Sequence, residues 1–200
     1  MKLNKMFNTL KIKTMKSKKS ISIIILSLTF ILLSISFINA QTYVVDKGTA
    51  FFKAKVSINS YTGNSDQLNG FINFETGEIE FSIPANSIKT SNKKRDKHMY
   101  EIINLEEHPT VSFKGSLINF YDESLKGKQT LKVKGSFTFV GATQELELEI
   151  DLSPEPDGLR MHANWALLIT DYNLERPSKA FMTVKDEHEM RVDAFLVKEN

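Results

Sequence analysis

One pattern dominates this sequence: apolar and polar residues alternate with a period of two over much of its length. The pattern is clearest in ELELEIDL at residues 145–152, where Leu or Ile alternates with Glu or Asp. Successive side chains of a strand point to opposite faces, so this segment predicts a strand with one buried face. Because each such strand is apolar on one side only, the sheet must close on itself or pack against a second sheet.

The same alternation predicts about eight strands in all. Besides 145–152, the expected strands are 50–58, 68–74, 77–84, 109–120, 131–139, 159–169 and 190–196. Turn-forming residues separate them at YTGNS (61–65), ETGE (75–78), YDESLKGK (121–128), VGATQ (140–144) and PEPDG (154–158). Short connections of this kind are typical of antiparallel hairpins. We therefore expect an all-β fold, an eight-stranded antiparallel barrel whose interior is filled by side chains or holds one slender ligand.

Small residues interrupt the apolar rows that should face the interior. They are Ala50, Ala54, Gly70, Gly115, Gly135, Ala163 and Ala194. Glycines inside strands often mark bulges or sharp bends. Small side chains spread over several inward rows also leave room for an apolar guest. Their number favours a cavity, and both explanations stay open at this point.

The first forty residues have the composition of a secretory signal. A basic stretch, KIKTMKSKKS, precedes the apolar segment at 21–37 and the small residue Ala40. We expect cleavage after Ala40, a single domain over residues 41–200 and a periplasmic or secreted location. An uncleaved anchor is the alternative, since the apolar segment is nearly long enough to span a bilayer.

Removal of this leader reverses the net charge of the chain. Seven of the 26 basic residues and none of the 24 acidic ones lie within it, which leaves 19 basic and 24 acidic residues, a net charge of −5. An acidic domain lacks the basic surface that binds nucleic acid. The sequence contains no cysteine, so disulfides and thiol chemistry are excluded.

Residues 92–105 break the alternation and predict a short helix. Met99, Ile102 and Ile103 form one apolar stripe at helical spacing. Ser91 or Asn92 can cap the helix, and Pro109 follows its end. We expect the helix to lie over the sheet or across one end of the barrel with this stripe inward, and Arg95 and Asp96 to hold it in place.

Two histidines and several carboxylates around this helix raise the question of chemistry. His98 and Glu101 are three residues apart, but neither a tight set of three or four ligands nor an HExxH motif is present, so we expect no metal. An exported hydrolase that uses His98 with Asp96 or Glu101 is the enzymatic alternative. Charged residues on the wet face of an amphipathic helix are the simpler interpretation.

Several segments resemble the YceI family of exported bacterial proteins. They are SIPANSIKT (82–90), RDKHMYEIINLEEHPTVSF (95–113), LKVKGSFTFVGATQELELEI (131–150) and, more loosely, LLITDYNLERP (167–177). The resemblance implies a lipocalin-like barrel without enzymatic activity that holds a polyisoprenoid or an isoprenoid quinone in its pore. The sequence departs from the family pattern at Asn104, Leu105, His108, Tyr172 and Asn173. These differences affect the expected ligand more than the expected fold.

The apolar rows and the helix stripe together give the residues that we expect to contact such a ligand. They are Phe52, Ala54, Phe74, Phe81, Ile83, His98, Met99, Ile102, Ile103, Phe113, Phe137, Phe139, Trp165 and Leu167. A polar head is expected at one end, near His98, Arg95 or Tyr100. We expect no cofactor and no catalytic residue. A ligand-free interaction or stress module is the alternative function, and homodimerisation and transient membrane contact stay open.

Overall fold

The computed structural model describes residues 41–56, 59–179 and 182–199. The predicted leader (1–40) and residues 57–58 of the first expected strand lie outside these ranges. The elements are β1 (Thr42–Val56), β2 (Asn59–Ser65), β3 (Asn69–Asn73), β4 (Glu78–Pro84), η1 (Ala85–Ser87), α2 (Lys93–Ile102), β5 (Thr110–Leu117), β6 (Gln129–Phe139), β7 (Ala142–Glu155), β8 (Gly158–Leu168), η2 (Ile169–Tyr172), β9 (Ser178–Lys179) and β10 (Met182–Lys198).

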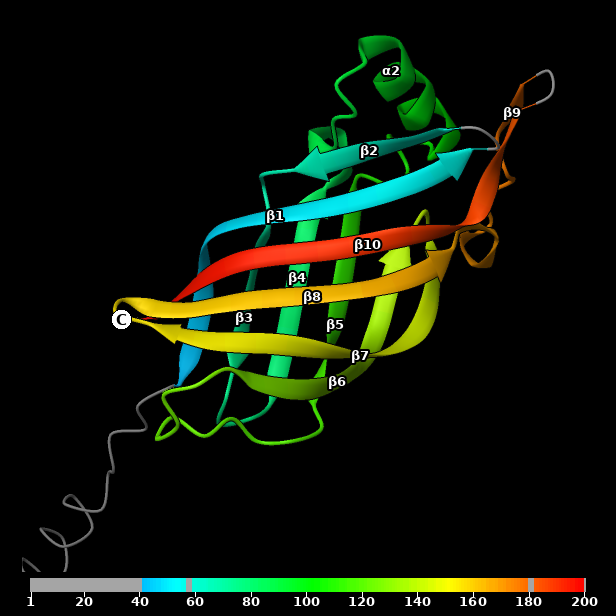
Figure 1. The fold of residues 1–200 in the computed structure, drawn as a ribbon. Helices are drawn as coiled ribbons and strands as arrows, with labels where there is room; N and C mark the ends of the chain where they lie inside the picture. The colour runs from blue at the N-terminus through cyan, green and yellow to red at the C-terminus, as the bar shows by residue number, and fades with distance from the viewer. Residues whose placement is uncertain (1–40, 57–58, 180–181, 200) are drawn as a thin grey trace, which may run out of the picture. The chain divides into compact units, whose positions relative to one another are not determined.

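Eight of the described strands form a closed antiparallel barrel, as the alternation predicted. Neighbours pair in the order β1-β3-β4-β5-β6-β7-β8-β10, and β10 pairs back with β1 (Figure 1). Inward residues are buried along every row, for example Ile79, Val133, Leu152 and Leu196, each at most 1% exposed. The interior of the barrel is therefore the single apolar core of the domain.

The prediction of a turn at YTGNS (61–65) is wrong, because these residues belong to β2. This strand pairs with the second half of β1, from Ala50 opposite Ser65 to Val56 opposite Asn59, while β3 pairs with the first half of β1. Gly63 lies opposite Phe52, and a Cβ at Gly63 would collide with the Phe52 ring. The glycine that suggested a turn is instead required by the packing of an aromatic ring on its own strand pair.

Glycines in the barrel wall mark close approaches of backbone rather than open space. Gly115 of β5 lies directly opposite Gly135 of β6, and a Cβ on either would collide with the backbone of the other strand. Gly70 has a φ of +153°, and a Cβ there would meet the carbonyl oxygen of Glu80. The pairing at these glycines is regular, so close contact between strands explains them, and the prediction that they leave room for a cavity is wrong.

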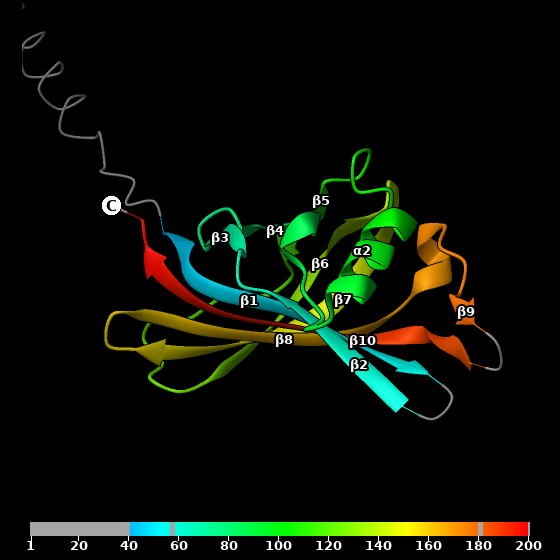
Figure 2. The same ribbon diagram turned by 90° about the horizontal axis from the view of Figure 1, so that it is seen from above.

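The α-helix closes one end of the barrel. It begins after Asn92, whose side chain accepts hydrogen bonds from the backbone amides of Lys94 and Arg95 at 3.1 Å each. It lies at the end opposite the described chain termini, which are joined by a hydrogen bond from the Glu199 amide to the Thr42 carbonyl at 2.9 Å (Figure 2). The expected helix and its Asn92 cap are thus confirmed, and the helix ends at Ile102, three residues before the predicted limit.

Candidate functional site

A cavity of about 170 Å³ lies inside the barrel beneath α2, and we call it the end cavity. Its wall is formed mainly by apolar side chains from strands around the barrel and from α2. Its lining residues include Ala50, Phe52, Tyr61, Ile83, Arg95, His98, Met99, Ile102, Ile103, Val111, Phe137, Phe139, Leu167, Val184, His188 and Met190. The apolar stripe of the helix therefore faces the interior, as its spacing predicted.

A smaller space of about 50 Å³, the inner void, lies further along the same inward rows. Phe81, Phe113 and Trp165 line it, together with aliphatic residues of neighbouring strands. Phe137 of the end cavity meets Trp165 of the inner void edge to face, with ring centroids 5.8 Å apart. This aromatic pair is a contact at the boundary between the two spaces.

The residues predicted to contact a ligand fall into three groups. Phe52, Ile83, His98, Met99, Ile102, Ile103, Phe137, Phe139 and Leu167 line the end cavity. Phe81, Phe113 and Trp165 line the inner void. Ala54 is fully buried but lines neither space, and Phe74 stacks on Tyr121 toward the opposite end of the barrel, with ring centroids 4.6 Å apart. A role of any of them in binding stays a prediction.

Asp96 holds the helix to the segment that precedes it. Its Oδ1 accepts hydrogen bonds from the Thr90 amide at 2.8 Å and from the Thr90 hydroxyl at 2.6 Å. Burial would raise the pKa of Asp96, but these hydrogen bonds and the charges of Lys89 and Arg95 hold it below its usual value. Asp96 is thus an anchor of the fold, as expected from its place in the first turn of the helix.

The enzymatic alternative finds little support in this arrangement. Asp96 is 8% exposed and bonded to Thr90, whereas the His98 side chain is 70% exposed and lies 3.6 Å from Glu101, between Nδ1 and Oε2. Among the described residues, Asp96 has no hydrogen bond to His98. The pair His98–Glu101 is an exposed contact one turn apart, which is common on helix surfaces.

Among the described residues, the titratable side chains that line the end cavity are Tyr61 of β2, Arg95 and His98 of α2, and His188 of β10. The Arg95 guanidinium lies over the Tyr61 ring, 4.6 Å from its centroid, and both residues line the cavity. Burial raises the pKa of Tyr61 against the opposing effect of the Arg95 charge. Tyr100, predicted as a contact of the polar head, is not among the lining residues, since its hydroxyl donates to the Ile88 carbonyl at 2.6 Å.

His188 of β10 is a cavity residue that the sequence analysis did not identify. It is 8% exposed, and its ring lies 6.0 Å from the Phe52 ring between centroids. His188 precedes the predicted strand at 190–196, so the sequence did not assign it to a face of the barrel. The one usable signal was position, since His188 continues the inward row of Met190 toward the helix end.

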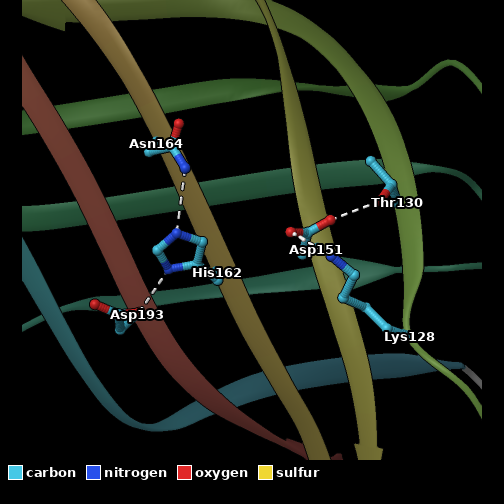
Figure 3. A network of polar contacts seen from close by, with 6 residues as sticks. All are labelled: Lys128, Thr130, Asp151, His162, Asn164 and Asp193. Atoms are coloured by element: carbon cyan, nitrogen blue, oxygen red, sulfur yellow. Dashed lines mark hydrogen bonds and ion pairs between the residues drawn. The ribbon is translucent and has the colours of Figure 1, made fainter.

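His162 of β8, in contrast, lies on the outer surface of the barrel. Its Nδ1 is 2.7 Å from Oδ1 of Asp193, and its Nε2 is 3.2 Å from the Asn164 amide nitrogen (Figure 3). Asp151 lies on the neighbouring strand and is bonded to Thr130 at 2.6 Å. Within the described ranges no group of three or more histidine, aspartate or glutamate residues is arranged to hold a metal ion.

Comparison with known proteins gives a family model and several solved structures. The model, described as a YceI-like domain, matches residues 42–196. A polyisoprenoid binding domain from Saccharophagus degradans has 13% identity and a TM-score of 0.67, covering 80% of this chain and 99% of its own. Burkholderia cenocepacia BcnA has 11% identity and a TM-score of 0.62, covering 76% and 96%.

A YCEI protein from Campylobacter jejuni is also similar, with 15% identity, a TM-score of 0.55 and coverage of 72% and 88%. Likeness at these identities establishes a shared barrel fold. No match to a curated protein sequence was found. In the part of the chain that the structure describes, no helix has the length and apolar character needed to cross a bilayer.

Proposed function

Because the chain belongs to the YceI-like domain family, we propose that it is a binding protein that holds a long-chain isoprenoid amphiphile in its barrel. The observation that supports this most strongly is the end cavity, an interior space with mainly apolar walls and a few polar groups. Such a space suits a molecule with an apolar chain and a small head. One of the similar structures is a polyisoprenoid binding domain, which agrees with this choice of ligand.

The size of the cavity sets a condition on binding. Ligand pockets usually measure about 300–1,000 Å³, and the end cavity has about 170 Å³. A long chain therefore needs the inner void as well, and a movement of Phe137 away from Trp165, at the boundary of the two spaces, would join them. Burial of the chain would drive binding at roughly 25 cal/mol per Å² of apolar area, before the cost of ordering the chain.

Neighbouring leucines of β8 provide a matched test of this proposal. Leu167 lines the end cavity and is 8% exposed, whereas Leu168 points outward and is 42% exposed. We expect Leu167→Asp to lose binding of farnesol, measured by displacement of a fluorescent apolar probe, and Leu168→Asp to bind as the wild type does. Leu167→Trp fills the cavity without adding charge, so it tests the same point if the aspartate variant does not fold. Unchanged binding by a folded Leu167 variant contradicts the proposed position of the ligand.

We also propose that the protein acts outside the cytoplasm, after removal of residues 1–40. The basic and apolar composition of this segment supports export. The barrel begins at Thr42, so cleavage after Ala40 leaves every described strand intact. N-terminal sequencing of the protein from its native host should find Gln41 first, and an intact leader would contradict cleavage.

A further inference from the structure

The most informative polar group in the end cavity is His188, because one of its two ring nitrogens already has a hydrogen-bond partner in the described residues and the other has none. Nδ1 lies 3.0 Å from the backbone carbonyl oxygen of Asp186. A carbonyl oxygen can only accept a hydrogen bond, so Nδ1 must carry the proton and donate it. In the neutral ring Nε2 then has a lone pair and acts as an acceptor.

The backbone around Asp186 is built in a way that fixes this tautomer. Between the pairs Ala54–His188 and Val56–Val184, β10 has two more residues than β1, which makes a bulge. The carboxylate of Asp186 in the bulge accepts hydrogen bonds from the Thr170 amide at 3.1 Å and the Thr170 hydroxyl at 2.8 Å. These contacts hold the Asp186 backbone, and therefore its carbonyl, in place beside the histidine.

The surroundings of His188 favour its neutral form. Burial lowers the pKa of the ring, and the hydrogen bond and charge of Asp186 oppose this effect without cancelling it. Among the described residues, no side chain or backbone group bonds to Nε2. The residue is more than nine-tenths buried and lines the cavity, so within the described residues Nε2 is an acceptor without a partner in a mainly apolar space that also contains Tyr61, Arg95 and His98.

We propose that His188 selects the head of the ligand by accepting a hydrogen bond from it at Nε2, so that the preferred head is an uncharged hydroxyl. A free isoprenoid alcohol or a quinol has this chemistry, whereas an ether or a quinone does not. Once the ligand chain displaces water from the cavity, an acceptor that stays without a partner costs free energy, so the site discriminates against a head that cannot donate. This inference rests on the proposed function and adds the class of head group to it.

Arg95 is the feature that argues for a different head, since a guanidinium attracts phosphate. In this structure its charge lies over the Tyr61 ring, and its Nη1 is 3.5 Å from the Thr90 carbonyl oxygen. Arg95 is thus already held by the wall of the cavity. The two residues therefore predict different preferences, which a set of ligands with one chain and three heads can separate.

The test compares farnesol, its methyl ether and farnesyl phosphate in binding to the purified full-length protein, each by displacement of one fluorescent apolar probe. We expect the wild type to prefer the alcohol to the ether by about tenfold, the effect of one hydrogen bond to a buried acceptor. His188→Phe keeps a ring of similar size without an acceptor, so it should bind both equally. His188→Gln restores an acceptor oxygen and should recover part of the preference. The matched control is His162→Phe on the outer face of β8, which should leave the preference unchanged (Figure 3).

The possible results separate this inference from the proposed function. Equal binding of alcohol and ether by the wild type overturns the role of His188 while leaving a lipid-binding barrel in place. Tightest binding of the phosphate, lost in Arg95→Gln and kept in His188→Phe, overturns it in favour of an anionic head. Absence of binding for all three compounds by folded protein contradicts the proposed function itself.

Discussion

Replacement of Asp96 by alanine should destabilise the domain by about 3 kcal/mol. The side chain is 8% exposed and accepts two hydrogen bonds from Thr90, at 2.8 and 2.6 Å. A hydrogen bond to a charged group contributes about 1.5–3 kcal/mol, and a buried amide left without a partner costs about 1–3 kcal/mol. Thr90 is itself only 6% exposed, so water cannot readily replace the lost carboxylate. Because the two bonds share one oxygen, their effects are not simply additive.

Denaturation in urea at pH 7, followed by fluorescence of Trp165, the single tryptophan, measures this loss. The control is Glu101→Ala on the wet face of the same helix, where the carboxylate is 61% exposed and the expected change is below about 0.5 kcal/mol. A loss of less than about 0.5 kcal/mol for Asp96→Ala would refute the anchoring role derived from these contacts.

The same contacts predict a pH dependence with a definite sign. The pKa of Asp96 is lower in the folded protein than its usual value, so the charged form stabilises the fold. This stabilisation is complete above the unfolded pKa of about 3.9 and is lost as the pH falls through the lower folded pKa. The difference in stability between wild type and Asp96→Asn should therefore be largest near neutral pH and shrink below about pH 4. An equal difference at pH 7 and pH 3 would contradict this assignment.

Three other substitutions test the packing of the barrel. Phe137→Asp, at a cavity residue 5% exposed, should abolish lipid retention, and extraction of lipid from folded variant protein would count against its assignment to the lumen. Gly135→Ala should lower the free energy of unfolding by about 1–3 kcal/mol, measured by thermal denaturation, because the added Cβ would lie 2.5 Å from the Gly115 Cα. The control Gly127→Ala should change the stability little, since a Cβ there has no atom within 4 Å. Equal stabilities of the two variants would rule out the close approach of Gly135 and Gly115. Asn92→Ala removes the cap of α2 and should lower the free energy of unfolding by about 1 kcal/mol, measured by urea denaturation. A variant as stable as the wild type would contradict the role of Asn92 as a cap.

The closed barrel was predictable because its strands carry local information. In ELELEIDL every second residue is apolar, and Ile150 and Leu152 are indeed buried while Glu145, Glu147 and Glu149 are exposed. The turn predicted at 140–144 is confirmed at Val140 and Gly141, which have positive φ of 49° and 70°, whereas residues 142–144 already belong to β7. Local patterns were sufficient where the strand itself determines which face is buried.

Features that depend on register between distant strands were not predictable. The polar segment at 61–65 becomes a strand because Gly63 meets Phe52 across the sheet, and the pairing of Gly115 with Gly135 has no local signature. His188 lies two residues before the predicted strand at 190–196 and continues its inward row, but no local pattern indicates the cavity beside it. The apolar rows and the helix thus predicted many of the lining residues, including Arg95 and His98, whereas the polar residues Tyr61 and His188 were found only in the structure.

The most direct test of the central claim is the cargo of the protein itself. The mature protein is purified from its native host, extracted with organic solvent, and the extract is analysed by mass spectrometry, with circular dichroism of the same preparation to show that it is folded. The account predicts one isoprenoid amphiphile in stoichiometric amount, carrying a free hydroxyl. A clean extract from folded protein would contradict the account and favour a barrel that acts without a ligand.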